Sequence, residues 1–273
     1  MKTTKNIFLF ILIFASTHVV THAQSEEYFS RHDQNMYQPQ KVGLKDLVVE
    51  IRIDKLKDVL NQRLIFGKIE DLHFKLYWAA PNKRAIEVVG MPEGFKEAKE
   101  ELKRLAAIES QYLIPTSLTE EFKNFNLSYT SKSKTEITAI DPSYRTPASE
   151  VIVRLDKKGT VQKIRRLSAV GTEVSELKFR PDRQKSLLDS MEITSRKGLQ
   201  KISTIKNFSY QNIEGMKLMS KIEVNTNHRL EKINRSRLNN LERNVATQVT
   251  FTNFQVNTGD ALDFIRNSSQ QAE

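Results

Sequence analysis

The chain has 273 residues, a formal net charge of +10 and no cysteine. The absence of cysteine excludes disulfides, thiol catalysis and thiolate metal sites, so the fold must depend on a hydrophobic core. The basic residues are scattered rather than packed in one tract. Two interpretations of the charge stay open: a soluble basic surface, and contact with an anionic surface such as phospholipid headgroups.

The first residues have the order of a cleavable signal peptide. Two lysines precede the apolar run Ile7–Ala15, and small residues near Ala23 stand where a signal peptidase reads the chain. The run is shorter than the about 20 residues that span a bilayer, and an uncleaved anchor is the alternative. We expect residues 1–23 to be removed, leaving a soluble mature chain that starts near Gln24 and is exported to a bacterial periplasm.

Residues 24–43 are polar and lack periodicity, which predicts a flexible lead-in. Lys45–Ile53 then alternates with a period of two, which indicates a strand. A helix is the alternative for this segment, but its β-branched residues favour the strand. The spacing of apolar residues over 54–64 predicts a short amphipathic helix.

A β-hairpin follows. Leu72–Trp78 and Arg84–Val89 both alternate, and Pro81 interrupts them. Trp78 is the single tryptophan, and two roles are open for it: capping the core of the hairpin, or lining an apolar cavity.

The clearest helix lies over Phe95–Leu113, where apolar residues recur at helical spacing. Thr116 or Ser117, with Glu120, has the pattern of an N-cap and capping box that opens a second short helix ending at Phe125. The segment 95–125 is therefore predicted to be helical with one break.

From Asn126 onwards the pattern is that of strands joined by tight turns, which predicts an antiparallel meander. The fold class predicted is mainly β with segregated helices (α+β), in which the helices at 54–64 and 95–125 cover one face of the sheet. The predicted strands are Leu127–Ile140, Glu150–Leu155, Val161–Val170, Glu173–Phe179, Met191–Thr194, Gly198–Gln211, Met216–Thr226 and Ala246–Val256.

A polar, basic segment interrupts the meander at 227–245, and we expect it to be a loop insertion within a single domain over 44–258. Interleaved apolar residues leave open a short amphipathic helix on an anionic membrane or a solvated loop. Residues 259–273 are expected to be a polar tail. The candidate anionic-surface residues are Arg229, Lys232, Arg235, Arg237 and Arg243.

The sequence has none of the common catalytic signatures. It contains no GxSxG, HExxH, GxGxxG or P-loop pattern, and no pair of histidines has metal-ligand spacing. A pair of carboxylates distant in the chain is the one catalytic arrangement that stays open. We expect a protein that is not an enzyme and needs no cofactor or metal.

Three segments resemble the LolA-like proteins, which are periplasmic lipoprotein carriers and their relatives. Leu72–Val88 is similar to the family's early hairpin, with an aromatic residue, Pro-Asn and a basic residue between two strands. Tyr210–Ile222 is similar to its late hairpin, where a glycine turn precedes an apolar pair. Thr250–Asn257 resembles its closing strand, in which an aromatic residue and two asparagines recur. The resemblance covers about half of the mature chain.

The resemblance implies an incomplete β-barrel, a curved antiparallel sheet whose helical lid encloses a cavity for acyl chains. Carriers commonly have arginine before the hairpin proline, and this chain has Ala80. That difference favours a related lipid binder over a dedicated lipoprotein shuttle. The candidate cavity residues are Leu47, Val49, Ile51, Phe74, Leu76, Trp78, Ile86 and Val88.

We therefore expect an exported, non-enzymatic protein that binds a lipid or acyl chain. Its partner would be a lipid or an acylated protein, with an anionic membrane surface as a further contact, and not a nucleic acid. The alternative is an exported structural or interaction protein whose sheet packs on its helices without a ligand.

Overall fold

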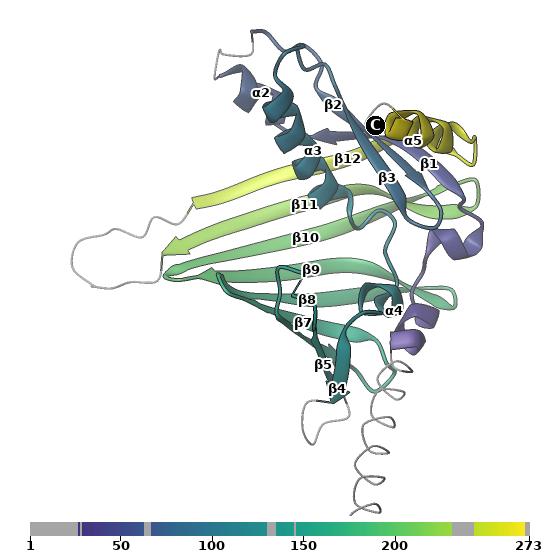
Figure 1. The fold of residues 1–273 in the computed structure, drawn as a ribbon, viewed down its shortest axis with the longest axis vertical. Coiled ribbons are helices and arrows are strands. Elements are labelled where there is room, and N and C mark those ends of the chain that lie inside the picture. Colours follow the sequence, from purple (N-terminus) through teal and green to yellow (C-terminus); the bar gives the residue numbers. More distant parts are fainter. Residues whose placement is uncertain are drawn as a thin grey trace, which may run out of the picture. The chain divides into compact units, whose positions relative to one another are not determined.

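The computed structural model describes residues 27, 29–62, 67–129, 135–144, 146–230 and 243–270. These residues are mainly β and form an antiparallel, unclosed sheet of twelve strands in the order β3-β2-β1-β12-β11-β10-β9-β8-β7-β6-β5-β4 (Figure 1). The predicted fold class, mainly β with segregated helices (α+β), is confirmed.

The strands are β1 (Asp46–Ile53), β2 (His73–Ala79), β3 (Lys83–Val89), β4 (Asn126–Tyr129), β5 (Glu136–Ile140), β6 (Glu150–Leu155), β7 (Val161–Ser168), β8 (Gly171–Asp182), β9 (Lys185–Lys197), β10 (Gln200–Ile213), β11 (Met216–Leu230) and β12 (Arg243–Val256). The helices are η1 (Pro39–Val42), α2 (Leu56–Asn61), α3 (Lys96–Ser110), α4 (Leu118–Glu121) and α5 (Asp260–Gln270), and residues 29–35 are also helical.

By its internal contacts the chain divides into two compact units. The first comprises Met1–Tyr37, Ser117–Thr204 and Asn227–Arg243, and the second comprises Gln38–Thr116, Ile205–Thr226 and Asn244–Glu273.

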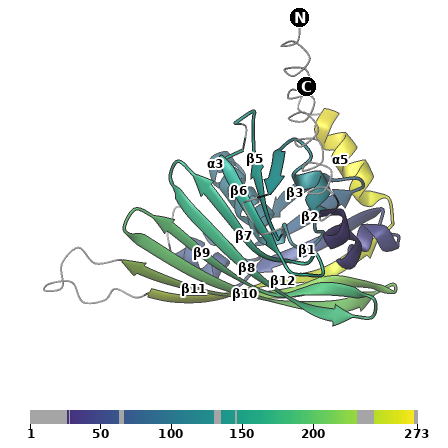
Figure 2. The ribbon, with the colours of Figure 1, turned by 90° about the horizontal axis from the view of Figure 1, so that it is seen from below.

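The first unit has its own hydrophobic core on one face of β5, β6 and β7, which lie side by side in Figure 2. Ile137 pairs with Val153, and Val153 pairs with Ile164, so these side chains share a face. Phe29 and Phe122 stack on each other within the same core, with ring centroids 5.2 Å apart. Removing this apolar surface from water is the main stabilising contribution to the unit.

The expected flexible lead-in is wrong for residues 29–42, which form a helix and the η1 turn. Asp33 explains part of this order, because its carboxylate accepts hydrogen bonds from the backbone N–H groups of Leu118 and Thr119 at 2.8 and 3.0 Å. It thereby satisfies free donors at the start of α4, where Ser117 is also the N-cap and accepts from Glu120 N. One polar residue of this segment, Asp33, therefore has a structural role at the start of α4.

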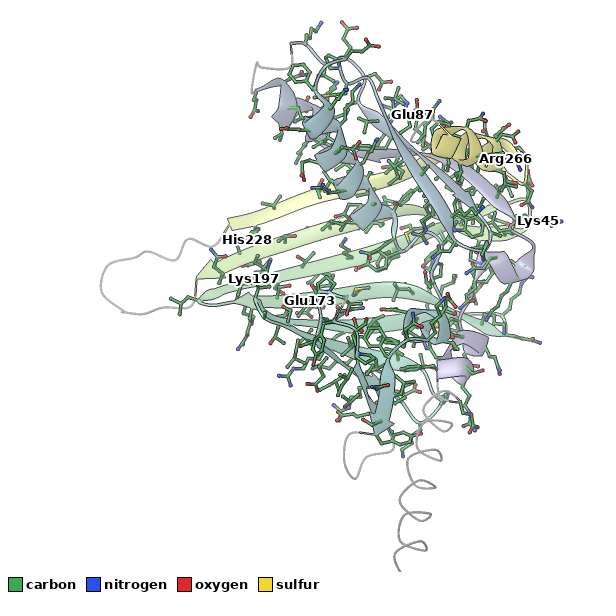
Figure 3. The ribbon with its side chains drawn as sticks, in the orientation of Figure 1. Lys45, Glu87, Glu173, Lys197, His228 and Arg266 are labelled. Atoms are coloured by element: carbon green, nitrogen blue, oxygen red, sulfur yellow. The ribbon has the colours of Figure 1, made fainter. Side chains whose placement is uncertain are left out.

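In the second unit, the expected polar tail is also wrong, because residues 260–270 form α5. Its apolar residues Ala261, Phe264 and Ile265 pack on Val48 and Tyr77, on one face of β1 and β2. Phe264 stacks on Tyr77 with ring centroids 3.7 Å apart. Figure 3 shows α5, which carries Arg266, beside the part of β3 that carries Glu87.

The two asparagines of the closing-strand motif have a structural explanation. Asn253 and Asn257 both adopt positive φ, 54° and 55°, a left-handed conformation that asparagine tolerates better than most residues. The Asn257 side chain accepts from Lys45 N at 2.7 Å and donates to Gly43 O at 3.0 Å. The motif therefore shapes and ties down the end of β12 before the chain turns into α5.

The segment expected to be a loop insertion is shorter than predicted. β11 continues to Leu230 and β12 begins at Arg243, so both ends of the expected loop belong to strands. Residues 231–242 lie outside the described part of the chain.

Candidate functional site

The candidate cavity residues share one face of the β1–β2–β3 sheet. Their side chains lie on the same side because directly paired residues of an antiparallel sheet point the same way. The pairs are Leu47 with Trp78, Val49 with Leu76, Ile51 with Phe74, Leu76 with Ile86, and Phe74 with Val88. On β12, Phe251 pairs with Ile51 and so extends this apolar face by one strand.

Six of the eight side chains, those on β1 and β2, are at most 2% exposed, whereas Ile86 and Val88 on β3 are partly buried. The apolar face therefore changes from closed to partly open towards the edge strand β3. An acyl chain that reaches Leu76 or Trp78 must displace whatever covers them.

Helix α3 and the residues that follow it contact both β3 and β10 (Figure 1). Arg84, which pairs with Trp78 and so points to its face, donates from Nη2 to the carbonyl of Ile114 at 2.8 Å. Gln40 donates to the carbonyl of the next residue, Pro115, at 2.8 Å. The end of α3 is thus held over the Trp78 side of the hairpin by two side-chain donors.

A buried ion pair makes the second attachment of α3. Lys206 Nζ on β10 lies 2.8 Å from Glu109 Oε2, and the two side chains are 6% and 17% exposed. Lys206 also lies over the ring of Tyr112, which in turn meets Phe208 edge to face. Separating Lys206 from Glu109 would leave a buried charge without its partner, so this contact favours the observed position of α3.

Burial lowers the pKa of the Arg84 guanidinium, but arginine stays charged at physiological pH. The residue as a whole is exposed, although its hydrogen bond to Ile114 is partly buried. Water can therefore reach this contact more easily than it can reach the Glu109–Lys206 pair.

Trp78 carries a polar atom without a partner. Its indole Nε1 is buried and has no hydrogen-bond acceptor. A buried donor left without an acceptor costs about 1–3 kcal/mol, and such groups in a structure call for an explanation. An acceptor bound at this face would remove that cost.

The helices of the predicted lid belong to different units of the structure. The part predicted over 54–64 contains α2 (Leu56–Asn61), which buries none of its residues, and the part over 95–125 contains α3 and α4. Helix α4 belongs to the first unit, where Leu118 packs into the core of that unit. Within the second unit, α3 is therefore the helix that contacts the face opposite α5.

Sequence reasoning missed Glu109 and Lys206 as functional candidates. The available signal was Lys206 itself, because it occupies a position two residues before Phe208 in an alternating strand, where an apolar residue is expected. A lysine at a buried strand position requires an anionic partner, but the sequence does not say which of many glutamates supplies it.

Two of the five candidate anionic-surface residues lie in described strands, at the neighbouring ends of β11 and β12. Arg229 lies near the end of β11 and Arg243 begins β12. Lys232, Arg235 and Arg237 lie outside the described residues. Within the described ranges, no three histidine or acidic side chains gather as a metal site, and no helix has the length and apolarity needed to cross a membrane.

Comparison of the chain with known protein families, with curated proteins and with solved structures found no match.

Proposed function

We propose that this protein is an exported, non-enzymatic binder of a lipid or acyl chain, and that the apolar face of β1–β3 is its binding surface. The observation that carries the proposal is the unpartnered indole N–H of Trp78 on a face made of aliphatic and aromatic side chains. A fatty acid or lipid ester offers both things this face can use: methylenes, each worth about 0.8 kcal/mol when buried, and an oxygen that accepts from Trp78.

Access would be controlled by α3. Ile86 and Val88 on the edge strand β3 are partly exposed, so an acyl chain would first contact these residues. Movement of the end of α3 would break the Arg84–Ile114 hydrogen bond and open the way to Leu76 and Trp78. The Lys206–Glu109 ion pair would keep α3 attached to β10 during this movement, so that the helix could return to its original position.

The resemblance to LolA-like carriers and the signal-peptide pattern of residues 1–23 support a periplasmic location and an acylated protein or lipid as the partner. The basic segment at 227–245 would then add contact with an anionic membrane. The composition, with no catalytic motif, supports a binding role.

The test uses Trp78 as its own reporter, since it is the single tryptophan. Titration of the purified protein with oleate should shift the emission of Trp78, and native mass spectrometry with organic extraction should find co-purified lipid. No spectral change together with no lipid in the extract would contradict the proposal and favour an interaction protein.

The role of α3 is tested by Arg84→Ala, with the neighbouring Lys83→Ala as the matched control. Arg84 pairs with Trp78 and contacts Ile114, whereas Lys83 pairs with Ala79 and is exposed. Arg84→Ala should speed the oleate-induced change several-fold by removing one hydrogen bond, worth about 1 kcal/mol. Equal rates in both variants would show that this contact does not control access.

A further inference from the structure

In the described part of the first unit, the exposed large hydrophobic side chains lie at one edge of its sheet, the edge formed by strand ends and turns. The large hydrophobic residues exposed in its described part are Ile140, Tyr144, Val170 and Leu199, at 43%, 79%, 69% and 49%. Ile140 ends β5, Tyr144 lies in the β5–β6 loop, and Val170 and Leu199 lie in the β7–β8 and β9–β10 turns. Alternate turns of an antiparallel meander lie at the same ends of the strands. The four exposed residues, which come from three connections, therefore lie along the same edge of the sheet.

The register places the two hairpin tips side by side. Thr172 pairs with Arg196, and an added Cβ on Gly171 would lie 2.0 Å from the Arg196 carbonyl. Continuing this register brings Val170 level with Gly198, next to Leu199. The two neighbouring tips therefore expose Val170 and Leu199 beside each other.

Cations surround these tips. Arg196, Lys197 and Lys201 flank Leu199, and among the described residues neither Lys197 nor Lys201 has an ion-pair partner. Figure 3 shows Lys197 at the free end of β9. The nearest acid on the paired strand, Glu173, already lies 3.6 Å from Arg166.

The other edge of the same strands provides an internal comparison. Its described turns, 156–160 between β6 and β7 and 183–184 between β8 and β9, also carry lysine and arginine but expose no large hydrophobic residue. Both edges therefore carry positive charge. Among the described residues of this unit, only the edge with Val170 and Leu199 combines that charge with exposed large hydrophobic side chains.

We propose that this edge docks the protein onto an anionic phospholipid surface, with Tyr144, Val170 and Leu199 entering the headgroup region and Lys197 and Lys201 contacting phosphates. Apolar side chains beside unpaired cations have the chemistry of an interfacial membrane contact. The site lies outside the apolar face of β1–β3 and outside the basic segment at 227–245, so it stands independently of acyl-chain binding.

The experiment measures binding of the purified protein to vesicles of phosphatidylcholine with phosphatidylglycerol, and to vesicles of phosphatidylcholine alone. Binding should require the anionic lipid. Tyr144→Ser/Val170→Ser/Leu199→Ser should weaken it by at least about tenfold. The control Val42→Ser/Val59→Ser, which changes valines that are 54% and 47% exposed in the second unit, should not.

Charge is tested separately by Lys197→Gln/Lys201→Gln, which should weaken binding by roughly tenfold at low salt and little at high salt. Lys157→Gln/Lys158→Gln removes the same charge from the other edge and should leave binding nearly unchanged. Equal losses in the two pairs would mean that net charge, and not this edge, controls binding, and would overturn the proposal.

A labelling experiment avoids dependence on multiple substitutions. Because the chain has no cysteine, Leu199→Cys and Lys158→Cys each accept one environment-sensitive dye. The dye at position 199 should shift to the blue on anionic vesicles, and the dye at 158 should not. Absence of the shift at 199, or failure of the unmodified protein to bind anionic vesicles, would overturn the proposal and point instead to a protein partner for this edge.

Discussion

His32 shows how a polar residue can be part of the core. Its side chain is buried, its Nδ1 accepts from Val161 N at 3.2 Å, and its ring meets Phe179 edge to face. Burial lowers the pKa of His32 to about 4, although the nearby carboxylates of Asp33 and Asp156 act in the opposite direction. The neutral ring is the form that the fold requires, because a protonated Nδ1 could not accept this bond.

This produces a pH dependence of stability. Unfolded histidine has a pKa near 6.5, so between that value and about 4 the unfolded chain binds the proton more readily than the folded one. Stability should therefore fall as the pH falls through this window, by about 2 kcal/mol at pH 5 relative to pH 8. Urea unfolding followed by far-UV circular dichroism at the two pH values measures it.

His32→Gln keeps an acceptor without a titrating ring and is the control. The variant should lose this part of the pH dependence while keeping the part due to other groups. Identical pH dependence in the variant and the unmodified protein would show that His32 does not control it.

Among the elements, α5 has the clearest energetic role, because it covers the face of β1 and β2 opposite the candidate binding face. Phe264→Ala removes the ring stacked on Tyr77 and should lower the free energy of unfolding by about 2 kcal/mol. Leu262→Ala, at an exposed position of the same helix, should change it little. Urea unfolding followed by Trp78 fluorescence compares them, and equal stabilities would mean that α5 contributes little to the unit.

The elements predicted well are those in which one face is apolar and the other polar. The hairpin β2–β3, strand β6 and helix α3 follow such patterns, and the structure has them within a few residues. The ends of β8, β9 and β11 were missed because both of their faces are partly exposed there, and the contrast that reveals a strand fades. The predicted strand Leu127–Ile140 is β4 and β5, with residues 130–134 outside the described chain.

The alternating pattern also placed the eight candidate side chains on a common face, because a period of two determines which residues point the same way. The sequence predicted that the helical segment 95–125 covers one face of the sheet, but the contacts that attach α3 could not be predicted. The contacts of α3 join residues about a hundred positions apart, as with Glu109 and Lys206. Likewise α5 has apolar residues at helical spacing, but they are too few in a polar segment to reveal a packed helix.

At the scale of the whole molecule, the first 23 residues predict export and cleavage. Because residues 1–23 have the order of a signal peptide, the exported protein should have its N-terminus within a few residues of Gln24. Intact-mass measurement of the soluble periplasmic fraction checks this. Full-length protein beginning at Met1 in the membrane fraction would contradict it and favour an uncleaved anchor.

The unclosed sheet leaves two edge strands, β3 and β4, and each is a template on which another chain could add a strand. Features of the sequence make strand addition unfavourable at both edge strands. β4 has four residues, too few for a long ladder of main-chain hydrogen bonds, and β3 begins with the cations Lys83 and Arg84 and is flanked by α3. Such edges disfavour the addition of a strand from another chain, since the same open sheet with long apolar borders would tend towards fibrils.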